Sequence, residues 1–293
     1  MSWTPFLPDP RYAARGREGG GGVAVPESVA LAFVCAAYVA TTVGFGDPAR
    51  AVAWVGLGIV MFAGAAGRGG WQGWAVVAAG LALGIAGRPL AVANHHYVLT
   101  WASLALALAL SAPVEERRTL VRHNARWLLV AIMGFATVHK LISGPFMDGS
   151  FLGFGIATGA FAEPLLQFCP SCLEAIGRNV AAVGEFRTTV PEAGAAVTLI
   201  DPVPNLPAVA RGFGLATLLV EAVLFALFLF VPRARATHLL LLAFAAGLGV
   251  IRQELTFISV VAVLGFMSCP AEHARLRWAY LAAAVAFSGL AIY

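Results

Sequence analysis

The chain has 293 residues, of which 60% are hydrophobic and only 12% are charged. Soluble domains are about 45–50% apolar and about 25% charged. This shortage of charge excludes an ordinary soluble enzyme and a disordered chain. The net charge of +4 does not gather into a basic stripe, so we expect no nucleic-acid partner. The composition predicts an integral membrane protein.

The first 27 residues are polar and contain the run Gly19 to Gly22. No apolar segment precedes Val23, so this region does not resemble a signal peptide. We expect residues 1–27 to form a flexible cytoplasmic tail.

Apolar runs follow, and we interpret each as a helix that crosses the membrane. They predict an all-α polytopic bundle of about eight or nine spans. The count depends on Arg252, Gln253 and Glu254, which separate two short spans or interrupt one broken helix. The predicted spans cover residues 28–45, 51–67, 72–87, 94–112, 126–143, 209–231, 236–251, 255–268 and 276–293.

The arginines predict the orientation of this bundle. With a cytoplasmic N-terminus and nine spans, twelve arginines lie inside and six outside, in agreement with the positive-inside rule. The bundle then has a first half at 28–143, with about five spans, and a second half at 209–293, with three to four. Between them, residues 144–208 are too long for a simple connection and predict a small extracytoplasmic cap. The arginine-rich, lysine-poor composition is typical of a GC-rich genome, so we expect a bacterial plasma-membrane protein.

Lys140 is the only lysine, whereas 18 residues are arginine. It lies 14 residues into a span that runs outward from Arg126, roughly 21 Å from the inner end. Lys140 could simply extend to the outer headgroups. An arginine would do this equally well, but only a lysine readily becomes a neutral amine. We therefore favour a role in proton transfer.

Other ionisable residues inside or beside predicted spans are candidates for function, because charged groups are costly there. We expect most of them near the outer end of the bundle, with Glu221 closer to the midplane. Each has a plainer alternative as an interfacial residue, a partner for a neighbouring charge, or part of a solvated turn. These candidates are His95, His96, Tyr97, His139, Glu221, Arg252 and Glu254.

Cys169 and Cys172 form a C-P-S-C pair in the predicted cap. They are either a structural disulfide or a redox-active pair, because C-x-x-C spacing suits thiol–disulfide exchange. The expected oxidising compartment favours the structural alternative. No Cys/His spacing resembles a zinc site, so we predict no metal.

Several of these segments carry a resemblance to a known family. Asn94-His95-His96-Tyr97-Val98-Leu99 looks like the N-H-x-Y-L motif of the vitamin K-dependent gamma-glutamyl carboxylases, whose membrane part defines the horizontally transferred transmembrane domain family. The stretch Gly134 to Leu141 resembles the K-K-L motif of that family, with His139 at a position where the family often has another lysine. Gly212 to Arg235 is similar to its acidic span, with Glu221 in place of an aspartate.

The resemblance implies an activity and a set of ligands. Lys140 would be the base that deprotonates a reduced, vitamin K- or menaquinone-type quinone, and His95 would be a second active-site residue. His96, Tyr97, His139, Glu221, Arg252 and Glu254 would surround the quinone. Dioxygen would be consumed in quinone epoxidation. In the family, carbon dioxide is then added to a peptide or protein substrate on the extracytoplasmic side.

Two other functions remain open at this point. One is a quinone-linked thiol–disulfide oxidoreductase that uses Cys169 and Cys172. The other is a non-enzymatic membrane subunit that binds a lipid or a partner protein through the same region.

Overall fold

A computed structural model describes residues 25–42, 48–65, 70–87, 94–188, 196–251 and 254–292. Throughout these ranges the regular structure is helical and no strand occurs, so the all-α prediction is confirmed. The expected cytoplasmic tail lies almost wholly outside the described residues, as does Arg252.

A helix occupies each apolar run of the sequence, because these runs lack internal prolines and consist largely of alanine, leucine and valine. By length and composition, two of the described helices are long and apolar enough to cross a membrane: α6 and α11. The helices at the apolar runs are α2 (Val25–Thr42), α3 (Pro48–Ala65), α4 (Trp71–Gly87), α5 (Asn94–Ser111), α6 (Val114–Ile142), α11 (Leu206–Phe230), α12 (Arg235–Ile251), α13 (Leu255–Ser268) and α14 (Ala274–Ile292).

Helix α6 differs from its predicted extent, since it begins at Val114 rather than at 126. Pro113 precedes the first turn, and Glu115 and Glu116 lie within it, where the positive end of the helix dipole favours carboxylates. The arginines at 117–122 therefore extend a helix and do not form a loop. Hydrophobic periodicity missed this extension because charged residues surround the added turns.

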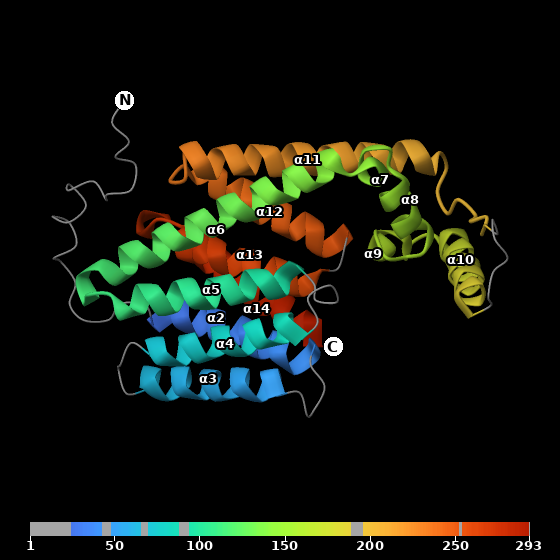
Figure 1. The fold of residues 1–293 in the computed structure, drawn as a ribbon. Helices are drawn as coiled ribbons and strands as arrows, with labels where there is room; N and C mark the ends of the chain where they lie inside the picture. The colour runs from blue at the N-terminus through green and yellow to red at the C-terminus, as the bar shows by residue number, and fades with distance from the viewer. Residues whose placement is uncertain are drawn as a thin grey trace.

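The helices pack in a bundle around α13 (Figure 1). Every residue from Ile258 to Ser268 of α13 is buried, and the helix contacts α2, α5, α6, α12 and α14. Such enclosure explains why α13 is apolar on all sides instead of amphipathic. On one side of it, α3, α4 and α5 pack in succession, and on the other α6 lies along α11.

Residues 144–188 and 196–208 gather at one end of the bundle (Figure 1). They form the helices α7 (Gly144–Met147), α8 (Ser150–Ala157), α9 (Glu163–Leu166) and α10 (Pro170–Thr188). A small apolar cluster holds this region to the start of α11. Its buried members are Ile156, Ala157, Phe161, Ala162, Leu206 and Ala210.

Candidate functional site

The antiparallel contact between α6 and α11 positions the residues of the candidate site. At one end of this contact, the guanidinium of Arg126 donates to the carbonyl oxygens of Phe228 and Leu229, at 2.9 and 2.7 Å. Further along, Gly134 leaves room for the ring of Phe225, which a Cβ at that position would approach to 3.0 Å. These contacts fix the register of the two helices and bring Lys140 opposite Glu221.

Lys140 and Glu221 form an ion pair in which Nζ donates a hydrogen bond to Oε1. The Lys140 side chain is 13% exposed and the Glu221 side chain 6%, so both charges lie mostly away from solvent. The ammonium also lies over the ring of Phe146, 5.3 Å from the ring centroid. A carboxylate and an aromatic face thus enclose the amine.

Phe146 reaches this position because the chain turns sharply after α6. The Ser143 amide donates to the Lys140 carbonyl at 3.3 Å, and α7 follows at once. Gly149, with φ of +85°, then passes so close to α11 that a Cβ would lie 2.7 Å from the Arg211 backbone nitrogen. Only a glycine tolerates both this φ and this approach.

Asp148, in the same turn, contacts the first residue of α8. Its carboxylate accepts the backbone N–H of Ser150 at 2.8 Å. This hydrogen bond, together with one from the Ser150 hydroxyl, lowers the pKa of Asp148. The charged Asp148 therefore stabilises the turn that places Phe146 over Lys140.

The last two turns of α6 carry apolar side chains on their exposed side. Val138, Leu141 and Ile142 are 54%, 54% and 76% exposed. These side chains form an exposed apolar surface on α6 that is close in sequence to Lys140.

The histidine pair on α5 divides into two different environments. His96 is buried: its Nε2 donates to the Leu81 carbonyl at 2.8 Å, and its Nδ1 then accepts from the Tyr38 hydroxyl at 2.6 Å. His96 therefore joins α2, α4 and α5 and is fully engaged in structure. His95 is half-buried and meets the Tyr38 ring edge to face, with centroids 5.2 Å apart.

The end of α6, which carries Lys140, and the start of α5, which carries His95, lie toward the same end of the bundle (Figure 1). Helix α6 has 29 residues and α5 has 18, so α6 is longer than α5 by roughly 16 Å. Among the described residues, neither a hydrogen bond nor an ion pair nor a ring contact joins His95 to Lys140.

The remaining predicted residues are dispersed. Tyr97 is half-buried on α5, and His139 is exposed on α6 beside Lys140. Glu254 precedes α13, and its carbonyl accepts the Ile258 amide at 3.0 Å.

Cys169 and Cys172 form a disulfide at the start of α10, with Cα atoms 5.2 Å apart. This places the pair in the 144–208 region and away from the α6–α11 contact. In the part of the chain that the structure describes, no group of three His, Cys, Asp or Glu residues is arranged to hold a metal.

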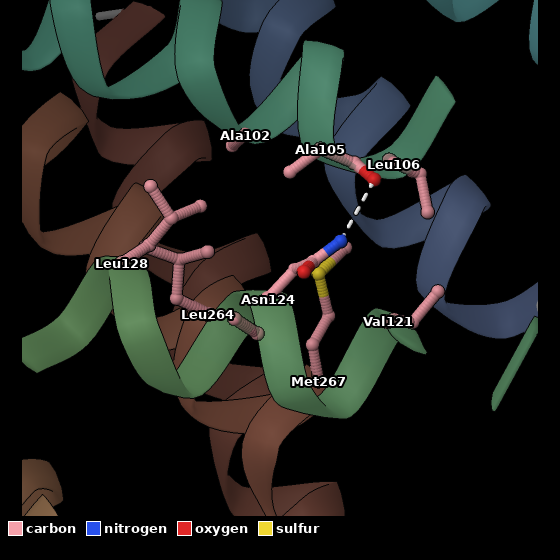
Figure 2. A pocket seen from close by; sticks show the side chains of 9 residues that line it. Ala102, Ala105, Leu106, Val121, Asn124, Leu128, Leu264 and Met267 are labelled. Atoms are coloured by element: carbon pink, nitrogen blue, oxygen red, sulfur yellow. Dashed lines mark hydrogen bonds between the residues drawn. The ribbon is translucent and has the colours of Figure 1, made fainter. Parts of the chain in front are cut away.

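A small gap lies between α5, α6 and α13 (Figure 2). Its nearest lining residue on α6, Leu128, precedes Lys140 by 12 residues, roughly 18 Å along the helix. Figure 2 shows Asn124 of α6 donating across the gap to the Ala105 carbonyl, at 3.2 Å. The gap is lined almost entirely by apolar side chains and satisfies its polar group internally, so it offers no ligand-binding chemistry.

The sequence analysis did not identify two residues that contact the candidate side chains: Phe146, which lies against Lys140, and Tyr38, which bonds His96. Tyr38 could have been found, because a tyrosine in an apolar run needs a partner for its hydroxyl. Phe146 depends on the turn geometry after α6, for which the sequence contains no comparable signal.

Comparison of the chain with protein-family models, with curated proteins and with solved structures finds no match in any of the three. The resemblance to the carboxylases therefore stays a prediction that rests on the motifs alone.

Proposed function

We propose that this chain is a polytopic membrane enzyme in which Lys140 and Glu221 together take a proton from a reduced quinone. In this proposal the bundle has eight or nine spans, a cytoplasmic N-terminus, and the 144–208 region outside. The reaction class is oxygen-dependent quinone epoxidation, as the resemblance implies.

One observation carries the proposal: the only lysine of the chain is paired with a buried carboxylate on another helix. Ionisable groups inside a membrane bundle are costly and mark functional sites by default. Eighteen arginines elsewhere supply every other strong cation, and an arginine would form an equally good ion pair. A lysine at this one position is explained if the amine must release its proton.

The ion pair provides a route for that release. Lys140 donates to Glu221, so the shared proton can pass from Nζ to Oε1 and leave two neutral groups. Apolar surroundings tolerate two neutral groups better than isolated charges. The neutral amine then accepts a proton from a substrate hydroxyl, and Glu221 holds the proton that the amine released.

The residues present fit a lipid-borne quinone in two respects. The Lys140 side chain retains 13% exposure, and exposed apolar side chains of α6 lie close to it in sequence. Phe146 adds an aromatic face next to the amine. When bound, the reduced quinone would supply the acidic hydroxyl. Because His95 does not contact Lys140, the proposal assigns the proton transfer to Lys140 and Glu221 alone.

The decisive variant is Lys140→Arg, which retains the charge and the ion pair but cannot act as a base. The purified protein in lipid nanodiscs would be supplied with reduced menaquinone and air, and quinone epoxide would be measured by mass spectrometry. We expect Lys140→Arg to lose activity by about 100-fold or more, the usual contribution of a general base.

The matched control is Thr217→Ala, one turn before Glu221 on α11. The Thr217 hydroxyl bonds only locally, to the Phe213 carbonyl at 2.9 Å. We expect this variant to retain activity. Full epoxidation by Lys140→Arg, or no epoxide from the unaltered protein, would contradict the proposal and favour a structural role for the pair in a non-enzymatic subunit.

A further inference from the structure

We infer that the Cys169–Cys172 disulfide is a thiol–disulfide exchange site that oxidises cysteine pairs in polypeptides with apolar flanking residues. The inference does not depend on the role of Lys140. It rests on the position of the two sulfurs, the groups around Cys169, and the surface next to it.

The two cysteines differ in accessibility in the manner that exchange requires. Cys172 is 7% exposed, whereas Cys169 is only half-buried. An incoming thiolate can therefore reach the Cys169 sulfur, and Cys172 is sheltered as the leaving group. A purely structural crosslink has no need for this asymmetry.

Cys169 also precedes the first turn of α10, where it occupies the N-cap position. Its carbonyl accepts the Cys172 amide at 3.0 Å and the Leu173 amide at 3.1 Å, and Pro170 follows as the first helical residue. The positive end of a 19-residue helix thus lies at the two sulfurs. Such a position stabilises a cysteine thiolate.

Ser171 adds a second group that acts on the same sulfur. Its hydroxyl lies 3.5 Å from the Cys169 sulfur, within hydrogen-bonding distance for sulfur. A hydroxyl that can rotate toward a thiolate would stabilise the reduced form further. This contact is independent of the helix end and points to the same chemistry.

The surface beside Cys169 is apolar. Phe168 is 90% exposed, and Leu165 and Leu173 are 49% and 37% exposed. Phe168 and Leu173 directly flank the two cysteines in sequence, and Leu165 lies four residues before Cys169. They match a polypeptide with apolar residues beside its cysteines better than a small charged thiol such as glutathione.

The exchange balances without any further reagent. A substrate thiolate attacks the Cys169 sulfur, and the bond to Cys172 breaks, with Cys172 leaving as a thiolate. The second substrate thiol then attacks the mixed disulfide and releases Cys169. The substrate loses two electrons and becomes a disulfide, while Cys169 and Cys172 gain them and take up the two protons.

The test uses the full chain in lipid nanodiscs and two synthetic dithiol peptides. One peptide has leucine and phenylalanine beside its cysteines, and the other has serine and glutamate. Mass spectrometry follows both oxidised peptide and reduced Cys169–Cys172. We expect stoichiometric exchange, about tenfold faster with the apolar peptide. Phe168→Ser should reduce that rate to the rate of the polar peptide, and Glu174→Ser, at an exposed position nearby, should not.

A second measurement separates exchange from structure. Cys172→Ser leaves Cys169 as a free thiol, and Cys169→Ser leaves Cys172 as a free thiol. An aromatic disulfide reagent should label Cys169 in the first variant at least about tenfold faster than Cys172 in the second. A disulfide that stays oxidised in excess peptide overturns the inference. Equal labelling of the two variants, or equal rates with the two peptides, also contradicts it.

Discussion

Lys140 on α6 and Glu221 on α11, 81 residues apart in sequence, form a mostly buried ion pair at the end of the contact between their helices. Burial of two charges is only a weak source of net stability, because desolvation offsets most of the attraction. Removal of one partner alone lowers the free energy of unfolding strongly, since the other charge then remains unpaired in apolar surroundings.

This asymmetry can be measured with a double-mutant cycle. Glu221→Met should destabilise the protein by about 3 kcal/mol, because it leaves the Lys140 ammonium buried without its carboxylate. Lys140→Met combined with Glu221→Met should recover most of that loss. Thermal unfolding in detergent, monitored by size-exclusion chromatography, would measure the stability of the single and the double variant. Additive losses in the double variant would show that the pair is not coupled.

Gly149 provides a test of how α7 and α8 are held against α11. Gly149→Ala should cost about 2 kcal/mol or more, because φ of +85° is unfavourable for alanine and its Cβ would overlap the Arg211 backbone. Gly144→Ala, at the start of α7, is the matched control, since nothing lies within 4 Å of its Cβ position. Equal stability of the two variants would argue against the close approach.

The two histidines of α5 should respond differently to substitution. His96→Ala removes two hydrogen bonds and a buried ring, and should destabilise the protein by about 2–4 kcal/mol. His95→Ala removes mainly an edge contact with Tyr38 and should cost less than about 1.5 kcal/mol. Thermal unfolding of both variants compares them directly. A larger loss for His95→Ala would contradict the assignment of His96 to structure.

Asn179 of α10 holds the segment that leads to α11. Its side-chain amide donates to the carbonyls of Ala157 and Ile200, and its oxygen accepts the Ile200 amide, all at 2.8 Å. Asn179→Ala should cost about 2–3 kcal/mol and accelerate hydrogen exchange at the Ile200 amide. Arg178→Ala, whose side chain is 60% exposed, is the control and should leave that exchange unchanged.

The sequence by itself determined where most helices lie. Each apolar run became a helix because a chain of alanine, leucine and valine satisfies its backbone groups within the helix, whatever surrounds it. It also marked Lys140, since a single lysine among 18 arginines is visible without a structure. Local composition failed most clearly at Val114, where charged turns extend α6.

Tertiary structure alone decided which polar residues meet. The ion pair between Lys140 and Glu221 depends on the register of α6 against α11, which is set by the Gly134–Phe225 contact and the Arg126 hydrogen bonds. Likewise, His96 became a structural residue because Tyr38 and Leu81 come from two other helices. Hydrophobic periodicity identifies which residues are apolar, but contacts between helices depend on side-chain shapes that interlock across the whole bundle.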